Sequence, residues 1–157
     1  MKRHAAETLR ALGALRLEVR RRGVLWCVQR VPNLVTLAGR NLIRDLLARE
    51  PGAAGLSYFA LGTGTTAPSS ADTRLAAEVF RDTFTQLTLG TGQLTVRYFL
   101  GSGAANGYAL AEAGLFGGSA SPTPGSGTLY SRVVFLDPIP KTQAITVTFI
   151  WVLSWEV

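Results

Sequence analysis

Residues 145–157 read ITVTFIWVLSWEV, and this stretch decides the fold class. Large apolar side chains recur at every second position, which indicates a β-strand with one buried face. Thirteen residues would span about 43 Å, so the strand must bend, join two sheets or extend into a neighbouring subunit. Ile150 and Val152 make the second face apolar as well, which indicates that both sides are covered there. Trp151 and Trp155 are therefore candidate assembly contacts.

The segments before this strand also favour antiparallel β-structure. Residues 15–20 alternate apolar and charged side chains, Arg22-Gly23 suits a tight turn, and residues 24–31 (VLWCVQRV) form the returning strand of a hairpin. Residues 75–80 fit either one helical turn or a strand, and residues 1–13 favour a short helix. Further strands are predicted at residues 56–61, 83–89, 93–100 and 128–136.

One segment has helical periodicity. Apolar residues recur at three- and four-residue spacing over residues 35–49, and charged residues fill the opposite side. Asn33 or Thr36 can cap the start of this helix, and Pro51-Gly52 ends it. The sequence therefore predicts an α+β fold that is mostly β: a β-sandwich-like antiparallel domain with one packed amphipathic helix.

The composition fits a single globular domain. Of the 157 residues, 47% are hydrophobic and 17% are charged, which argues against disorder. The single cysteine excludes an internal disulfide. The most apolar stretch, residues 145–155, is shorter than the roughly 20 residues that a membrane-spanning helix needs. No apolar run follows the basic start of the chain, so we expect a soluble protein with no targeting signal and no membrane span.

Positive charge is concentrated in the first third of the chain. Residues 1–50 contain eleven Lys or Arg and four Asp or Glu, whereas residues 51–157 contain five and six. We therefore distinguish a basic N-terminal segment and hairpin (1–31), a candidate docking element, from a β-rich structural domain (32–157). Such asymmetry favours an acidic partner, although a solvated basic edge explains the same pattern. The candidate assembly contacts are Arg16, Arg20, Arg21, Arg22 and Arg30.

The residues for enzyme chemistry are scarce. His4, the only histidine, lies near the N-terminus, and Cys27 falls within an apolar strand, so neither suits a nucleophile–base pair. Residues 101–107 imitate a phosphate-binding loop, but their GxGxxxG spacing departs from the nucleotide-binding pattern. We therefore expect no enzymatic activity, no catalytic residue, no cofactor and no metal.

Glu112 lies among small and apolar residues and would need a cationic partner if it is buried. Arg97 and Arg132 are the two candidates for this structural ion pair. The arginines of the hairpin would also suit nucleic acid, but Trp26 is the only aromatic residue near them, so nucleic-acid binding is the less favoured hypothesis.

Five stretches follow one another in order along residues 32–155. They are PNLVTLAGR (32–40), YFALGTGTTAP (58–68), Asp72-Thr73 with EVFR (78–81), YFL with ANG and EAGLF (98–116), and TLYSRVVF with PIPKT (128–142). Together they resemble small tail-fibre or baseplate structural proteins of tailed bacteriophages. Residues 1–31 match that family less well.

This resemblance implies a non-enzymatic structural component of the virion. The chain would act in the baseplate or the tail-fibre attachment region through subunit–subunit contacts with other tail proteins. We expect it to form a homo-oligomer within that assembly, which is built in the host cytoplasm. The alternative is a tail module that binds a host-surface receptor or glycan. Exposed aromatic residues in the loop 117–127 would favour the alternative, but that loop contains none.

Overall fold

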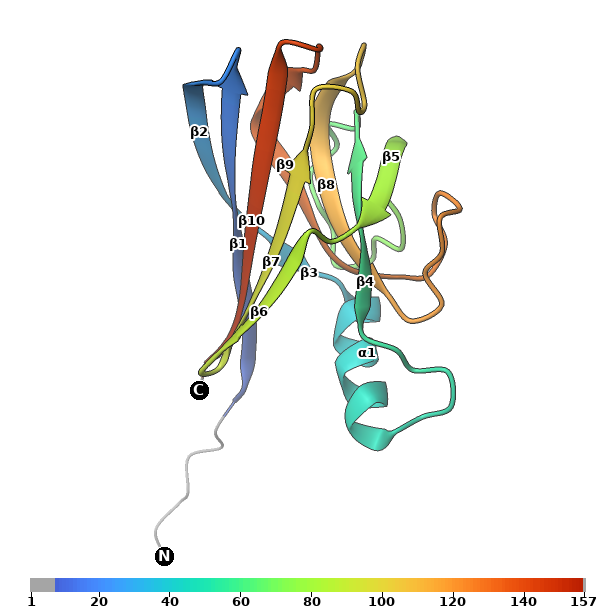
Figure 1. Ribbon diagram of the computed structural model, residues 1–157. Coiled ribbons are helices and arrows are strands. Elements are labelled where there is room, and N and C mark those ends of the chain that lie inside the picture. The colour runs from blue at the N-terminus through green and yellow to red at the C-terminus, as the bar shows by residue number, and fades with distance from the viewer. Residues whose placement is uncertain (1–7, 157) are drawn as a thin grey trace, which may run out of the picture.

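The computed structural model describes residues 8–156, which form two five-stranded antiparallel sheets packed face to face (Figure 1). Sheet A has the order β2-β1-β10-β7-β6, formed by Val24–Pro32, Arg10–Arg21, Ile145–Glu156, Gln93–Leu100 and Gln86–Gly90. Sheet B has the order β3-β9-β8-β4-β5, formed by Leu34–Val35, Thr128–Pro140, Ala109–Gly117, Leu56–Gly62 and Glu78–Thr83. Helix α1 (Leu37–Ala48) lies at the lower end of the sandwich in Figure 1. The predicted fold class is confirmed.

Strand β10 is the central strand of sheet A. It pairs with β1 along its whole length and with β7 on its other side, so its length is used within one sheet. Its odd-numbered residues from 145 to 153 are buried in the core, as the alternation predicts. Ile150 and Val152 lie on the opposite face and remain partly exposed. This second face is therefore only partly covered by the described residues, and its covering by another subunit stays a prediction.

Aromatic rings connect the two sheets at the centre of the core. Phe59 on β4 stacks on Tyr98 of β7 with ring centroids 4.8 Å apart, and its centroid lies 4.9 Å from that of Phe149 and 6.4 Å from that of Trp151. Trp151 is fully buried by these contacts. The prediction that Trp151 is an assembly contact is wrong, because its side chain holds the two sheets together instead.

The N-terminal hairpin is built into the sandwich. β1 lies between β2 and β10, and its apolar side chains at 15, 17 and 19 are completely buried. The turn at Arg22-Gly23 has positive φ at both residues, as a two-residue hairpin turn of mirror-image type requires. The boundary after residue 31 therefore does not separate two packing units, and the docking role of the hairpin stays a prediction that concerns only its surface.

One segment differs in type from the expectation, and one strand lies where none is predicted. Residues 10–13, expected to be helical, begin β1 because they pair with the end of β10, from Arg10 opposite Glu156 onward; residues 1–7 of that expected helix lie outside the described residues. Residues 109–117, which follow the glycine-rich loop, form strand β8 between β4 and β9. β8 is buried on both faces, so it lacks the alternation that marks a half-exposed strand.

Other boundaries shift by a few residues. β9 continues through Asp137-Pro138 to Pro140, and the ambiguous segment 75–80 contributes to strand β5, which starts at Glu78. Helix α1 is shorter than predicted because Val35 pairs with β9 in β3. Thr36 is its N-cap and accepts a hydrogen bond from the backbone N–H of Gly39 at 2.8 Å.

Candidate functional site

The outer face of sheet B is covered by the chain itself. The loop of residues 63–77, the covering loop, is anchored by Glu112 on β8, whose fully buried carboxylate accepts hydrogen bonds from the backbone N–H groups of Gly64, Ala76 and Ala77 at 2.7 to 3.1 Å. Leu75 from the same loop is buried in a small apolar cluster. Sheet B therefore has no large free face among the described residues.

Arg132 on β9 completes this anchor. Its Nε donates to Glu112 Oε2 at 2.8 Å, while its Nη1 and Nη2 donate to Asp72 Oδ2 at 2.8 Å and to the carbonyl of Thr66 at 2.9 Å. The prediction of a Glu112–Arg132 ion pair is confirmed. Arg97 as the alternative partner is wrong, because it lies on the outer face of sheet A, out of phase with the buried residues of β7.

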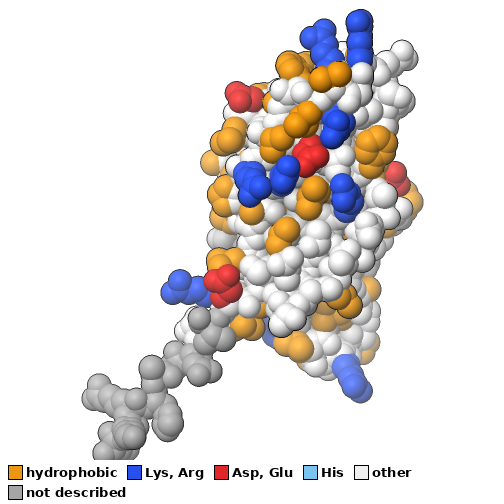
Figure 2. All heavy atoms as spheres, turned by 60° about the vertical axis from the view of Figure 1, so that its left-hand side comes forward, with side chains coloured by type: hydrophobic (Ala, Val, Ile, Leu, Met, Phe, Trp, Pro, Cys, Tyr) orange, Lys and Arg blue, Asp and Glu red, His pale blue; other side chains and the backbone are white. Residues whose placement is uncertain are grey.

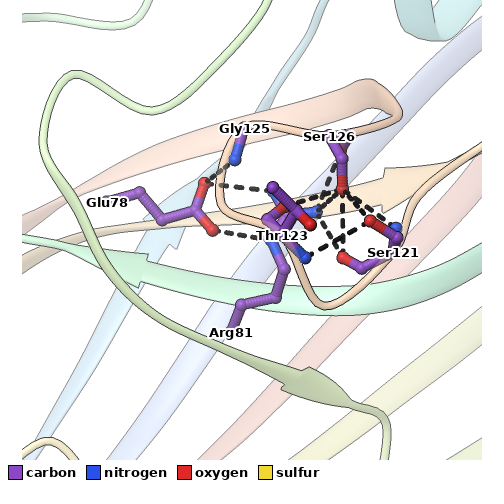
Figure 3. Close-up of polar contacts among 6 residues, drawn as sticks. All are labelled: Glu78, Arg81, Ser121, Thr123, Gly125 and Ser126. Carbon is purple, nitrogen blue, oxygen red and sulfur yellow. Dashed lines mark hydrogen bonds and ion pairs between the residues drawn. The ribbon is translucent and has the colours of Figure 1, made fainter.

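A second loop, residues 118–127, is fastened to strand β5 (Figure 3). Arg81 binds Glu78 at 2.6 Å and donates to the carbonyl of Ser126 at 2.9 Å, while Gly125 N–H donates to Glu78 Oε2 at 3.0 Å. The Arg81 guanidinium also lies 4.1 Å from the centre of the Phe116 ring. This loop is the one in which exposed aromatic residues would have favoured glycan binding, and its polar side chains are largely used in holding its own shape.

Sheet A differs, because its outer face carries a row of arginines. In antiparallel pairing, residues directly opposite one another share a face. Arg30 on β2 is opposite Arg16 on β1, Arg16 is opposite Ile150 on β10, and Ile150 is opposite Arg97 on β7. Three arginines and one isoleucine thus form a line across four strands. None of these side chains is buried.

The next row along the strands adds apolar surface to the arginines. Val28 is opposite Glu18, Glu18 is opposite Thr148, and Thr148 is opposite Phe99, which is 52% exposed. Glu18 forms a salt bridge of 2.6 Å with Arg16. Figure 2 shows basic and hydrophobic side chains interspersed on this side of the molecule. We call this surface the arginine face; it comprises Arg16, Glu18, Val28, Arg30, Arg97, Phe99, Thr148 and Ile150.

The tip of the hairpin also combines exposed arginines with apolar side chains. Arg20, Arg21 and Arg22 are all exposed, and the Arg21 guanidinium lies 5.9 Å from the centre of the Trp26 ring. A shallow hollow of about 430 Å³ is lined by Arg21, Arg22, Val24, Leu25 and Trp26. All five predicted arginine contacts therefore lie on the surface of the hairpin. The predicted contacts do not include Arg97, Phe99 and Ile150. The alternation along β7 and β10 was the available signal, because it places these residues on the face that points away from the core.

Trp155 lies in a different place from the arginines. It lines an apolar groove of about 360 Å³ between α1 and the end of sheet A, together with Leu42 and Leu46 of the helix, Tyr130 and Leu153. Trp155 is partly exposed, so it remains accessible from this groove. The two predicted tryptophan contacts thus separate into one core residue and one surface residue.

The titratable groups near these surfaces serve the fold. Burial, and secondarily Asp137, raises the pKa of the Cys27 thiol, which favours its protonated form. Burial lowers the pKa of Lys141, whose Nζ donates to Asn106 Oδ1 at 2.9 Å and so fastens the glycine-rich loop. Within residues 8–156, no three His, Cys, Asp or Glu side chains are grouped as metal ligands would be. His4 lies outside the described residues.

None of the helices described in residues 8–156 has the length and apolar character needed to cross a membrane. Comparison with protein-family models, with curated proteins and with solved structures finds no match to this chain.

Proposed function

We propose that this protein is a non-enzymatic structural subunit of a bacteriophage tail, in the baseplate or the fibre-attachment region, and that it docks to other tail proteins through the arginine face. One observation carries the docking surface: the chain covers the outer face of sheet B with its own loops but leaves the outer face of sheet A exposed. The tail assignment is supported by the five sequence stretches that resemble tail-fibre and baseplate proteins.

The composition of the arginine face supports a protein partner. Arginine and aromatic residues are enriched at protein–protein interfaces, and their contacts combine apolar area with directional hydrogen bonds. Arg30, Arg16 and Arg97 are held in line by strand pairing, so they are positioned before a partner arrives. Several copies of the chain would be arranged in the virion, each contacting an acidic surface of another tail protein.

The test replaces Arg16 and Arg97 together by glutamate in tail particles assembled in the host. The matched control replaces Arg40 and Arg74, which are exposed outside the arginine face, and carries the same change in net charge. We expect both proteins to fold, and the face variant to melt a few degrees lower because Arg16→Glu removes the salt bridge to Glu18. The Arg16→Glu/Arg97→Glu protein should be missing from purified particles, whereas the control protein should be present at the wild-type level.

Two results would overturn parts of this proposal. If the wild-type chain is absent from tail particles, the tail assignment fails. If the face variant is incorporated normally, the arginine face is not the assembly surface. Normal particles that no longer adsorb to host cells would favour the receptor- or glycan-binding role instead. Binding to nucleic acid would show itself as an affinity that falls steeply with salt.

A further inference from the structure

The four sheet edges of the sandwich differ in length and in protection. β2 is an edge strand of nine residues, whereas the other edge strands, β6, β3 and β5, have five, two and six. β5 is further protected by the loop 118–127, which is fastened to it through Arg81 and Glu78. A free edge exposes backbone N–H and C=O groups that can pair with another strand. β2 is therefore the longest edge available for such pairing.

The side chains of β2 do not protect this edge. Val24, Leu25, Trp26 and Val28 are between 41% and 71% exposed, although each is a residue type that is usually buried in monomeric proteins. Within the strand the only charged residue is Arg30, and the only proline is its last residue. Edge strands that avoid partners normally carry several charges or a central proline.

A groove runs along the free edge of β2. It has a volume of about 320 Å³ and lies between β2 and residues 137–140 of β9. The side chain of Gln29 connects β2 to β9 across this groove. Its Nε2 donates to the carbonyl of Asp137 at 2.9 Å, and its Oε1 accepts from the Asp137 N–H at 3.1 Å. The groove provides room for the inward-facing side chains of an added strand, while its outward-facing side chains would lie beside the arginine face.

We propose that β2 receives an extended acidic strand from another protein, which continues sheet A by β-augmentation. This inference rests on the proposed function only for the origin of the strand, a neighbouring tail subunit. Backbone hydrogen bonds to β2 supply the pairing, as in other recognition by strand addition. Apolar side chains of the strand enter the groove beside β9, and its carboxylates contact Arg30 and the hairpin tip.

Charge favours this occupant over a second copy of the same hairpin. Residues 16–30 contain five arginines and one glutamate. Two such hairpins joined edge to edge would bring like charges together, which is unfavourable at short range. An acidic strand instead neutralises the arginines, and attraction between opposite charges also accelerates its association.

The test uses full-length protein and a capped, fluorescein-labelled peptide of five glutamate–valine pairs, followed by fluorescence anisotropy. A first control peptide has proline at two central valine positions, so that it keeps its charge but cannot pair as a strand. A second has lysine in place of glutamate. On the protein, Arg30→Glu is compared with Arg40→Glu, which makes the same charge change on α1. Amide hydrogen exchange locates the bound peptide.

We expect the glutamate–valine peptide to bind, and both control peptides to bind at least about tenfold more weakly. Arg30→Glu should weaken binding by about tenfold, and Arg40→Glu should leave it within about twofold. Exchange should slow at residues 24–32 and remain unchanged at residues 86–90 of β6.

The proposal would be overturned by no binding of the acidic peptide, by equal binding of the proline peptide, or by protection outside β2. A protein that is already dimeric in light scattering, with β2 protected, would assign the edge to a second copy and overturn the acidic partner. These results do not depend on tail particles, so failure of the tail assignment would be seen separately.

Discussion

Replacing Glu112 by alanine should destabilise the protein more than any other single change in the anchor of the covering loop. The Glu112 carboxylate is fully buried, 2.8 Å from Arg132 Nε, and it also accepts three backbone N–H groups of the loop at 2.7 to 3.1 Å. Glu112→Ala leaves all four donors without this acceptor. Removing one partner of a buried ion pair costs about 3–5 kcal/mol, so we expect a loss of about 4 kcal/mol.

The neighbouring groups should matter less, in a defined order. Arg132→Met leaves a buried carboxylate that is still hydrogen-bonded by the three backbone N–H groups, so we expect a loss of about 3 kcal/mol. Asp72→Ala removes a carboxylate whose side chain is 23% exposed, and the remaining Arg132 keeps Glu112. We expect that variant to lose about 1–2 kcal/mol.

Urea denaturation followed by tryptophan fluorescence measures these losses. With a slope of about 2 kcal/mol per molar urea, a loss of 4 kcal/mol lowers the midpoint by about 2 M. Glu112→Gln is the control, because it keeps the shape and an acceptor oxygen and should lie between Glu112→Ala and the wild type. Equal losses for Glu112→Ala and Arg132→Met, or a loss below about 1 kcal/mol for Glu112→Ala, would refute the idea that the loop amides depend on this carboxylate.

Three further predictions concern the core and the helix. Burial raises the pKa of Tyr130 to about 12, and its hydroxyl has no hydrogen-bond partner among the described residues; Tyr130→Phe should therefore be nearly neutral at pH 7. Below pH 10 Tyr130 is protonated in both the folded and the unfolded chain, and the wild type keeps its full stability. As the pH rises through 12, the unfolded chain loses this proton more readily than the folded chain, so the wild type loses stability. In chemical denaturation at pH 12, Tyr130→Phe should therefore gain on the order of 2 kcal/mol relative to the wild type. Gly39→Ala should cost about 1–3 kcal/mol in urea, because a Cβ at Gly39 would meet the backbone of Tyr130; a neutral result would show that α1 can move away from β9. Trp151→Ala should lose about 3–5 kcal/mol, whereas Phe99→Ala should lose less than about 1 kcal/mol, and equal melting temperatures for the two variants would contradict their placement.

The sequence predicts which side chains share a face of a strand better than it predicts what that face contacts. The alternation in residues 145–153 correctly groups the side chains that share a face of β10. It does not state whether that face meets the core or another subunit, so it also allows Trp151 to be an assembly contact. The number of apolar residues on the face was the usable signal, because so large an apolar face belongs in the core of a single domain.

The candidate site shows the same limit. Glu112 required a cation, and both Arg97 and Arg132 were available in the sequence. The alternation along β7 distinguishes the two arginines: Val96 and Tyr98 are buried in the core, so Arg97 between them points away from it. The row of Arg30, Arg16 and Arg97 could not be predicted, because it depends on the strand order and register of sheet A, which join segments far apart in the sequence.

The composition of strand β8 explains why the outer face of sheet B is covered, whereas that of sheet A is exposed. Its residues are mostly small and apolar, with poor intrinsic preference for strands, and they are buried on both faces. Such a strand is stable only where other segments cover it, and the covering loop and loop 118–127 occupy the outer face of sheet B for that reason. Sheet A needs less cover, because the outward-facing residues of β1, β7 and β10 are mostly polar or charged. The docking surface that we propose therefore lies on the sheet whose strands are stable when exposed, and the free edge of β2 continues it.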